Sequence, residues 1–255
     1  MNNIIMNELD YVKNMYENKL LADTPAKTIM YLAKYFIQVE KLPGKDTVKA
    51  IDTYMRQVLP DYYDTDWYKT VLSSIKAANK YSLANVEYII VYKDELEKLL
   101  EIENIDLRKL GFCILCGAKY RNKKFNIDSD WCNFNFREIF RLANVTYRKS
   151  EYLMQLKMLI DSGLFGVSWS EKNYIRPTFM QSSGDEVMKI TSMKDLGKQY
   201  LVYYGEYFIC DKCGGFARQN KNKTKKYCLT CRDEVKKERD REYKKTARTA
   251  KMSLG

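Results

Sequence analysis

The sequence contains no histidine. Without an imidazole, the protein cannot use a Ser-His-Asp triad, a Cys-His nucleophile, an HExxH metalloprotease site or a nuclease site with a histidine base. It also lacks the G-x-x-x-x-G-K-[ST] phosphate loop and the G-x-G-x-x-G dinucleotide fingerprint. These absences exclude several large classes of enzyme.

Long apolar stretches are absent as well. The longest nearly uncharged apolar run, residues 110–118, spans about nine residues, whereas a membrane helix needs roughly 20. Residues 1–8 carry no basic patch followed by an apolar segment, so we expect no signal peptide. Seven cysteines without a secretion signal favour metal ligation over disulfides, and we therefore expect a reducing, cytoplasmic environment.

The remaining composition is that of a folded protein. The chain has 255 residues, of which 45% are hydrophobic and 30% charged. This length suits one large domain or two small ones, and the apolar content is too high for general disorder.

Positive charge is concentrated at the C-terminal end. The formal net charge is +11, and residues 210–255 hold 15 basic and 6 acidic residues, a net of +9. The preceding 209 residues hold 29 basic and 27 acidic ones. Such a segment is typical of contact with a polyanion, because neutralising phosphates releases counterions. A solvated tail that merely keeps the protein soluble is the alternative.

Four cysteines in this basic segment have the spacing of a metal site. Cys210 and Cys213 form one C-x-x-C pair, Cys228 and Cys231 form another, and 14 residues separate the pairs. Two such pairs can place four sulfurs in a tetrahedron around one ion. Gly214 follows the second cysteine, where a tight turn needs positive φ. We therefore predict a structural zinc ribbon, against the alternatives of a redox dithiol pair or free thiols.

Basic residues surround the predicted zinc ligands. The loop between the two pairs carries Arg218, Lys221, Lys223, Lys225 and Lys226. A helix predicted over residues 232–251 carries a stripe of Lys237, Arg241, Lys244, Arg248 and Lys251. Pairs such as Asp233/Lys237 could explain part of this stripe in an exposed helix, but most of it has no acidic match. We expect these side chains to contact nucleic-acid phosphates.

We predict that the other three cysteines lie in the hydrophobic core. Cys113 and Cys116 lie three residues apart in the apolar run, and Cys132 has no partner at metal-ligand spacing. Free cysteine in such surroundings behaves as a small hydrophobic residue.

Helical periodicity dominates residues 1–105, and a short strand is possible at residues 88–92. Residues 106–182 then give a helix over 107–119, a second over 136–143 and a third over 147–162, with Leu153, Leu156 and Ile160 facing inward. Gly163 ends the third helix, and a hairpin follows. We expect residues 183–205 to connect this region to a ribbon unit over residues 206–255.

This order of elements resembles a winged-helix domain. In that family the third helix enters the major groove and the hairpin rests on the DNA backbone, although many members bind protein instead. The resemblance implies nucleic-acid contacts by Arg148, Lys149, Tyr152, Lys172 and Arg176. The whole chain is also similar to uncharacterised phage and prophage proteins of Gram-positive bacteria, which end in a segment like residues 204–213. That similarity implies a phage or mobile-element origin and a bacterial host cytoplasm, without an activity.

The sequence thus predicts a mainly α protein with a helical body, a winged-helix-like region, a four-cysteine zinc ribbon and a basic helix. We expect a non-enzymatic nucleic-acid-binding protein, with DNA as its partner, in transcription regulation or replication. The first alternative is an adaptor that docks a host or phage machine, such as a polymerase, helicase or defence complex, through its ribbon. The second is a Mg²⁺ nuclease that uses Asp61, Asp64 and Asp66, residues that more simply cap a helix.

Overall fold

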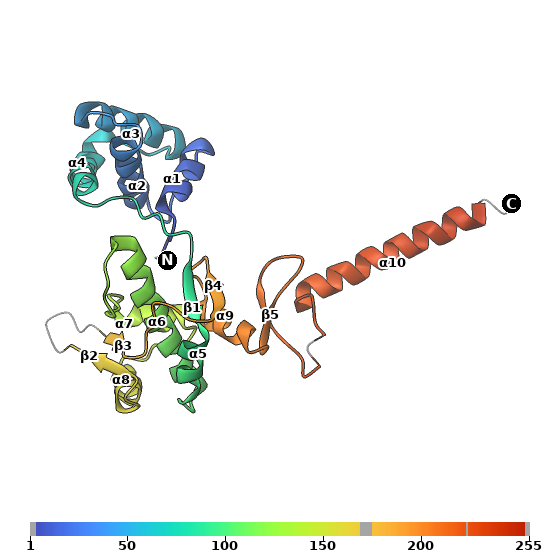
Figure 1. Cartoon of the computed structure of the whole chain (residues 1–255). Coiled ribbons are helices and arrows are strands. Elements are labelled where there is room, and N and C mark those ends of the chain that lie inside the picture. Colours follow the sequence, from blue (N-terminus) through green and yellow to red (C-terminus); the bar gives the residue numbers. More distant parts are fainter. Residues whose placement is uncertain (1–3, 169–174, 223, 253–255) are drawn as a thin grey trace.

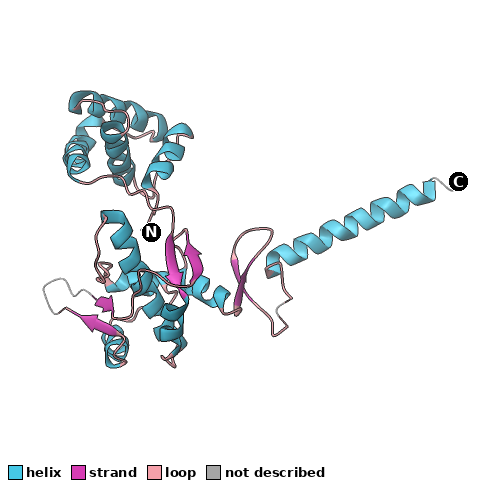
Figure 2. Cartoon of the chain, in the orientation of Figure 1, coloured by secondary structure: helices cyan, strands magenta, loops and turns pink. Residues whose placement is uncertain are grey.

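Helices dominate the computed structural model of the chain, which describes residues 4–168, 175–222 and 224–252, the last eight by their backbone alone. The described strands form three separate two-stranded antiparallel sheets (Figure 2). The expected mainly α class is therefore confirmed. The chain forms a helical bundle, a central body and a small hairpin unit from which the last helix projects (Figure 1).

The N-terminal unit is a bundle of helices with its own core. Its helices are α1 (Glu8–Glu17), α2 (Pro25–Gln38), α3 (Gly44–Val58) and α4 (Asp64–Lys80). In the sequence, Thr24 followed by Pro25 is a helix start signal, since a capping side chain precedes a proline in the first turn. Accordingly α2 begins at Pro25, and the Thr24 side chain caps it by accepting the Lys27 N–H. Apolar side chains from all four helices pack into one buried cluster.

A buried ion cluster joins the bundle to the central body. Glu8 of α1 accepts hydrogen bonds from Lys34 of α2 at 2.8 Å, from Lys124 of the body at 3.3 Å, and from the Ala84 N–H at 3.1 Å. Burial alone would raise the pKa of Glu8, but the Lys34 hydrogen bond and the Lys124 charge outweigh burial and lower this pKa below its ordinary value of 4.5. Glu8 therefore stays ionised between two lysines.

We expect Glu8→Gln to destabilise the fold by about 2–3 kcal/mol at neutral pH, because it leaves buried Lys34 without a counter-charge. A lowered carboxyl pKa stabilises the folded state above the unfolded pKa, and this contribution is lost as the pH falls through the folded pKa. Urea unfolding should therefore show a difference between wild type and variant that shrinks below about pH 4.5. Exposed Glu87→Gln is the control. A difference independent of pH would contradict the assignment.

The central body is built around one long helix. Its elements are β1 (Ile89–Tyr92), α5 (Lys93–Leu100), α6 (Ile105–Phe125), α7 (Phe136–Leu142), α8 (Tyr152–Asp161), β2 (Phe165–Val167), β3 (Ile175–Pro177), β4 (Glu186–Ile190) and α9 (Leu196–Tyr203). Every residue of α6 from Leu110 to Tyr120 is buried, which explains the uncharged run in the sequence. Cys113, Cys116 and Cys132 lie fully buried in this core, as predicted.

Segments distant in the sequence complete this body. β1 pairs with β4, placing Ile89 opposite Ile190, and α9 contributes buried Leu196 and Tyr200 to the same core. Residues 183–205, expected to be a connection, are thus part of the body, and so are β1 and α5 from the expected N-terminal region. The physical reason is burial, because β4 and α9 cover apolar surface of β1 and α6.

The order α6, α7, α8, β2, β3 follows the expected helix, helix–turn–helix and hairpin. Two details of the third helix were predicted wrongly. It begins at Tyr152 rather than Tyr147, because the Tyr147 ring packs against Phe140 and Tyr152, with ring centroids 5.5 and 5.0 Å away. Leu153 does not face inward and is 59% exposed, whereas Leu156 is buried. The face of α8 that packs against the core differs from the predicted one, because partly buried Tyr152 lies there in place of Leu153.

The C-terminal unit is a hairpin followed by a helix. β5 (Tyr207–Ile209) pairs with β6 (Phe216–Arg218), and α10 (Leu229–Met252) projects away from the body (Figure 1). β5 contacts α9, so the hairpin is seated on the central body. Its own core consists of little more than Phe208, Cys210 and Cys231. So small a core needs additional stabilisation.

Candidate metal centre and nucleic-acid interface

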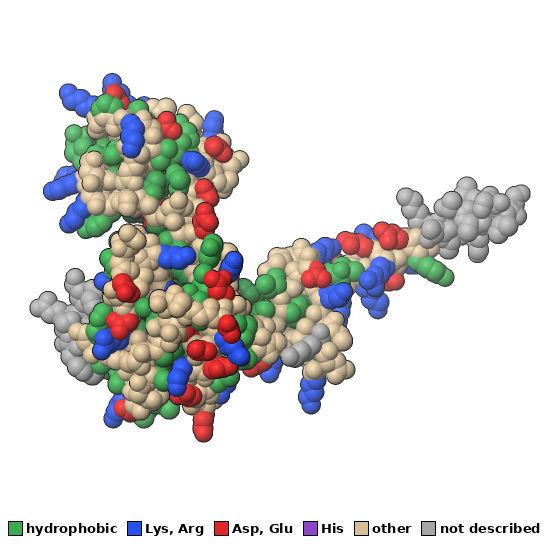
Figure 3. Space-filling view, viewed as in Figure 1, with side chains coloured by type: hydrophobic (Ala, Val, Ile, Leu, Met, Phe, Trp, Pro, Cys, Tyr) green, Lys and Arg blue, Asp and Glu red, His purple; other side chains and the backbone are tan. Residues whose placement is uncertain are grey.

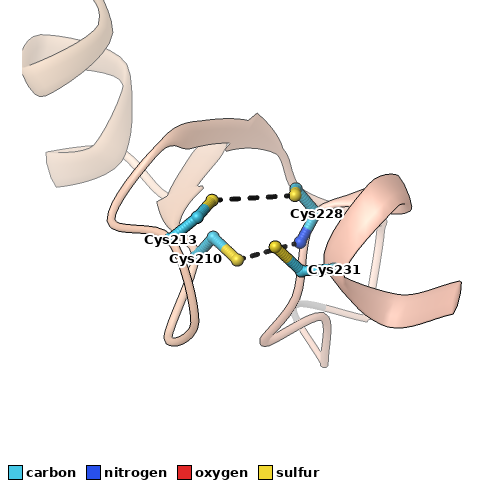
Figure 4. A group of neighbouring side chains, drawn as sticks. All are labelled: Cys210, Cys213, Cys228 and Cys231. Carbon is cyan, nitrogen blue, oxygen red and sulfur yellow. Dashed lines mark hydrogen bonds between the residues drawn. The ribbon is translucent and has the colours of Figure 1, made fainter. Parts of the chain in front are cut away.

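The four C-terminal cysteines converge as their spacing predicts. Cys210 follows β5, Cys213 lies in the next turn, Cys228 precedes α10 and Cys231 lies in its first turn. Their Sγ atoms all lie within 4.8 Å of one another (Figure 4). Within the described part of the chain, no other three or more Cys, Asp or Glu residues gather closely enough to hold a metal ion.

Backbone hydrogen bonds shape the turn around the first pair. The Gly214 N–H donates to the Cys210 carbonyl at 2.8 Å, and the Cys210 N–H donates to the Gly215 carbonyl at 2.9 Å. Gly214 has a φ of +66°, where a side chain would be strained. The Asp211 N–H donates to the Lys226 carbonyl at 3.0 Å and ties the two halves of the site together.

The sulfur geometry fits a zinc ion. A tetrahedron with Zn–S bonds of about 2.3 Å separates the sulfurs by about 3.8 Å. Cys213 Sγ and Cys228 Sγ are 3.9 Å apart, far beyond the 2.05 Å or so of a disulfide. Four thiolates would leave no coordination position for a substrate, so a zinc ion here would be structural.

Within the cluster the thiol pKa values move in opposite directions: the pKa of Cys210 is lowered, whereas a hydrogen bond with Cys228 and burial raise the pKa of Cys231. The Cys228 N–H donates to Cys210 Sγ at 3.3 Å, and this hydrogen bond is the largest influence that lowers the pKa of Cys210 to about 6 (Figure 4). Burial raises the pKa of Cys132 to about 12 and raises the pKa of Cys113 as well. Because metals bind the thiolate, Cys210 is prepared for coordination and the core cysteines are not.

One residue that the sequence did not single out contacts the projecting helix. Lys212, between the first two cysteines, contacts Glu234 at 3.2 Å and Glu238 at 2.9 Å on α10. Hydrogen bonds to Glu238 and Glu234 raise the pKa of Lys212. The acidic pair at i and i+4 was the available sequence signal, but only the fold shows which lysine it meets.

The predicted phosphate contacts of the hairpin are accessible. Arg218, Lys221, Lys225 and Lys226 are exposed, and Lys223 lies outside the described residues. Gln219 orders the loop, because its side-chain oxygen accepts N–H groups from Asn220 at 3.0 Å and Lys225 at 3.1 Å. These hydrogen bonds hold the described residues 219, 220 and 225 together, next to the exposed basic side chains.

The basic stripe of α10 is exposed too. Lys237, Arg241 and Lys244 are exposed, and among the described side chains none of the three forms an ion pair with a carboxylate. The Asp233/Lys237 and Asp240/Lys244 pairs that the helical spacing allows are therefore not formed among these described side chains. The side chains of Arg248 and Lys251 lie outside the described ones. Acidic side chains also lie on this helix, so that it presents both charges (Figure 3).

Several residues of the central body that were predicted to contact nucleic acid instead contact other side chains of the protein. Arg148 pairs with Glu151 at 3.1 Å. Arg176 pairs with Asp130 at 3.2 Å and lies over the Trp131 ring, 5.0 Å from its centroid. The Tyr152 ring packs against Tyr147, as described above. Of the remaining two, Lys149 is exposed and Lys172 lies outside the described residues.

Three large apolar side chains are exposed on α8, beside exposed Lys157 and Asp161, and sequence reasoning missed them. Leu153, Met154 and Met158 are 59%, 70% and 48% exposed. A cavity of about 490 Å³ lies beside them, lined by residues that include Phe136, Ile160 and Ile175. A helix that reads DNA bases normally presents polar side chains.

Two further observations bear on the alternatives. Asp64 forms an ion pair with Arg56, and the group of Asp61, Asp64 and Asp66 is not close enough to hold a metal ion.

In the described part of the chain, no helix has both the length and the apolar character needed to cross a membrane.

Comparisons with protein-family models, curated proteins and solved structures find no match to this chain. The residues and their geometry alone therefore carry the functional argument.

Proposed function

We propose that this protein is a non-enzymatic, zinc-containing nucleic-acid-binding protein of phage or mobile-element type, with DNA as its partner. The observation that carries this proposal is the convergence of the four cysteines beside exposed basic residues. Zinc would hold the hairpin and the start of α10 in one arrangement. The basic loop and helix then contact phosphates of one duplex. Such a protein suits transcription regulation or replication.

The central body supports a secondary role in this proposal. Its order of a helix, a helix–turn–helix and a hairpin supports the proposal of a winged-helix-like region, and the bridge between Cys132 and Ile175 joins the segment before α7 to the hairpin. Because Arg148 and Arg176 already have carboxylate partners, we assign most of the affinity to the ribbon and α10. Exposed Lys149 remains a proposed contact.

The salt dependence of binding tests this assignment. On a labelled duplex, the logarithm of the affinity should fall with the logarithm of salt concentration by about 0.9 per phosphate contact. Replacing Lys237, Arg241 and Lys244 together by Gln should lower the affinity and reduce that slope by about 2–3. A triple variant of exposed Lys13, Lys45 and Lys76 in the bundle removes the same charge and should leave the slope unchanged. Equal effects of the two triple variants would refute the proposed interface.

The exposed apolar side chains of α8 favour a second function, that of a protein-binding adaptor. Leu153 and Met158 offer the kind of surface that protein interfaces bury. If α8 contacts protein rather than DNA, Leu153→Glu with Met158→Glu should leave DNA affinity within about twofold of wild type. A larger loss would show that α8 approaches the phosphates, since added carboxylates are repelled there.

A further inference from the structure

A cleft on the central body lies apart from the ribbon. It has a volume of about 410 Å³, and its lining includes Ile90 and Tyr92 of β1, and Lys119, Asn122 and Lys123 of α6. Met180, Gln181 and Ser182 also line it, as does the carboxylate of Asp128. The cleft thus combines apolar, aromatic and basic walls, a combination typical of small-ligand sites.

One side of this cleft is neutral and fixed. Lys119 Nζ contacts Glu95 Oε1 at 2.8 Å and donates to the Gln181 carbonyl at 2.9 Å. It also lies 4.5 Å from the centroid of the Tyr92 ring. Glu95 is fully buried and accepts the N–H groups of Tyr92 and Gln181. These contacts hold the Tyr92 ring and the Gln181 backbone in place, so that this wall is preorganised.

A polar atom in the cleft lacks a partner. The side-chain oxygen of Asn122 is buried, and within the described structure it accepts no hydrogen bond. A buried amide oxygen without a donor is unfavourable, and native proteins keep few of them. Asn122 lines the cleft, so a ligand with an N–H group could supply the missing donor.

Two lysines with no acidic partner lie beside the cleft. Lys123 Nζ is 4.4 Å and Lys189 Nζ is 5.2 Å from the centroid of one ring, that of Tyr88. Both lysines are exposed, and among the described residues neither forms an ion pair. Two positive charges drawn to the same ring repel each other, and an anion between them would relieve that repulsion.

We infer that this cleft binds a nucleoside phosphate. The phosphate would lie between Lys123 and Lys189, away from Asp128. The base would enter the cleft against Ile90 and the Tyr92 ring, and its exocyclic amine would donate to Asn122. The ligand would be a free nucleotide or one nucleotide of a bound single strand, since both present the same groups. This inference goes beyond the ribbon and does not depend on the ribbon binding DNA.

Calorimetric titration of the full-length protein tests the inference. The probes are adenosine and cytidine monophosphates, which carry an exocyclic amine, uridine monophosphate, which lacks one, inorganic phosphate, and a short single-stranded oligonucleotide. We expect the two amine-bearing nucleotides to bind at least about tenfold more tightly than phosphate or uridine monophosphate. Binding of the oligonucleotide alone would identify the source as a bound strand, provided that Lys123→Gln with Lys189→Gln weakens it; oligonucleotide binding that these substitutions leave unchanged belongs to the ribbon and would overturn the proposal. Absence of binding by every probe, or equal affinity for phosphate and nucleotides, would overturn the proposal.

Variants separate this site from the ribbon. Lys123→Gln with Lys189→Gln should weaken nucleotide binding about tenfold or more, and Asn122→Leu should weaken it because the exocyclic amine of the base loses its acceptor. Lys45→Gln with Lys76→Gln, which removes the same charge from exposed bundle positions, should not. Substitutions in α10 should leave nucleotide binding unchanged while they weaken duplex binding. If the Lys123/Lys189 variant binds nucleotide like wild type, the site is wrongly assigned, whatever the ribbon does.

Discussion

Replacing Cys210 and Cys213 with serine is expected to abolish metal binding and to unfold the hairpin and the start of α10 while the rest of the protein stays folded. The small core around Phe208 cannot hold the hairpin alone, and a structural zinc ion supplies an apparent folding free energy on the order of 10–16 kcal/mol. The bundle and central body have separate, larger cores. Metal analysis, together with hydrogen exchange resolved along the chain, should show lost protection only beyond about residue 205.

The other C-x-x-C motif provides a matched control. Cys113→Ala with Cys116→Ala removes two buried thiols from α6 and should lower the stability of the body while leaving the metal content unchanged. If the Cys210/Cys213 variant instead loses protection throughout, the β5–β6 hairpin is an integral part of the body. If it keeps its metal, these two residues are not the ligands.

The second large effect is expected at Gly197, in the first turn of α9. A Cβ atom at this position would lie 1.9 Å from the carbonyl oxygen of Ala143, which ends α7. The obstacle is backbone, so no change of rotamer can relieve it. We expect Gly197→Ala to destabilise the protein by about 4 kcal/mol or more, because α9 would have to move away from a close-packed core.

Thermal or urea unfolding measures this effect, and Gly44 offers the control. Gly44 begins α3, and a Cβ atom there would meet nothing within 4 Å. Gly44→Ala should therefore change stability by no more than about 1 kcal/mol, in the stabilising direction. Equal stabilities of the two variants would mean that α9 does not pack against the end of α7 as described.

Local sequence signals predicted the local features well. The spacing of the terminal cysteines was sufficient to predict that four sulfurs lie close together, and Gly214 predicted the turn that needs positive φ. The cap at Thr24 placed the start of α2, and the possible strand at residues 88–92 is confirmed as β1. Each of these signals lies within a few residues of the feature it specifies.

Features that depend on distant contacts were not predictable. β1 and β4 are separated by about a hundred residues, and neither short segment contains a sequence pattern that identifies the other as its pairing partner. The Lys212 contact with α10 likewise depends on how the turn after β5 lies relative to that helix. The start of α8 is set by tertiary packing of the Tyr147 ring, which overrides the local helical pattern.

Elemental analysis of freshly purified, full-length protein tests the central claim most directly, because every proposed duplex contact of the ribbon depends on the cysteine cluster. The account predicts about one zinc ion per chain, and it predicts that removing this ion with a chelator weakens duplex binding. Protein that carries no stoichiometric metal, or that binds a duplex equally well after the metal is removed, would contradict it.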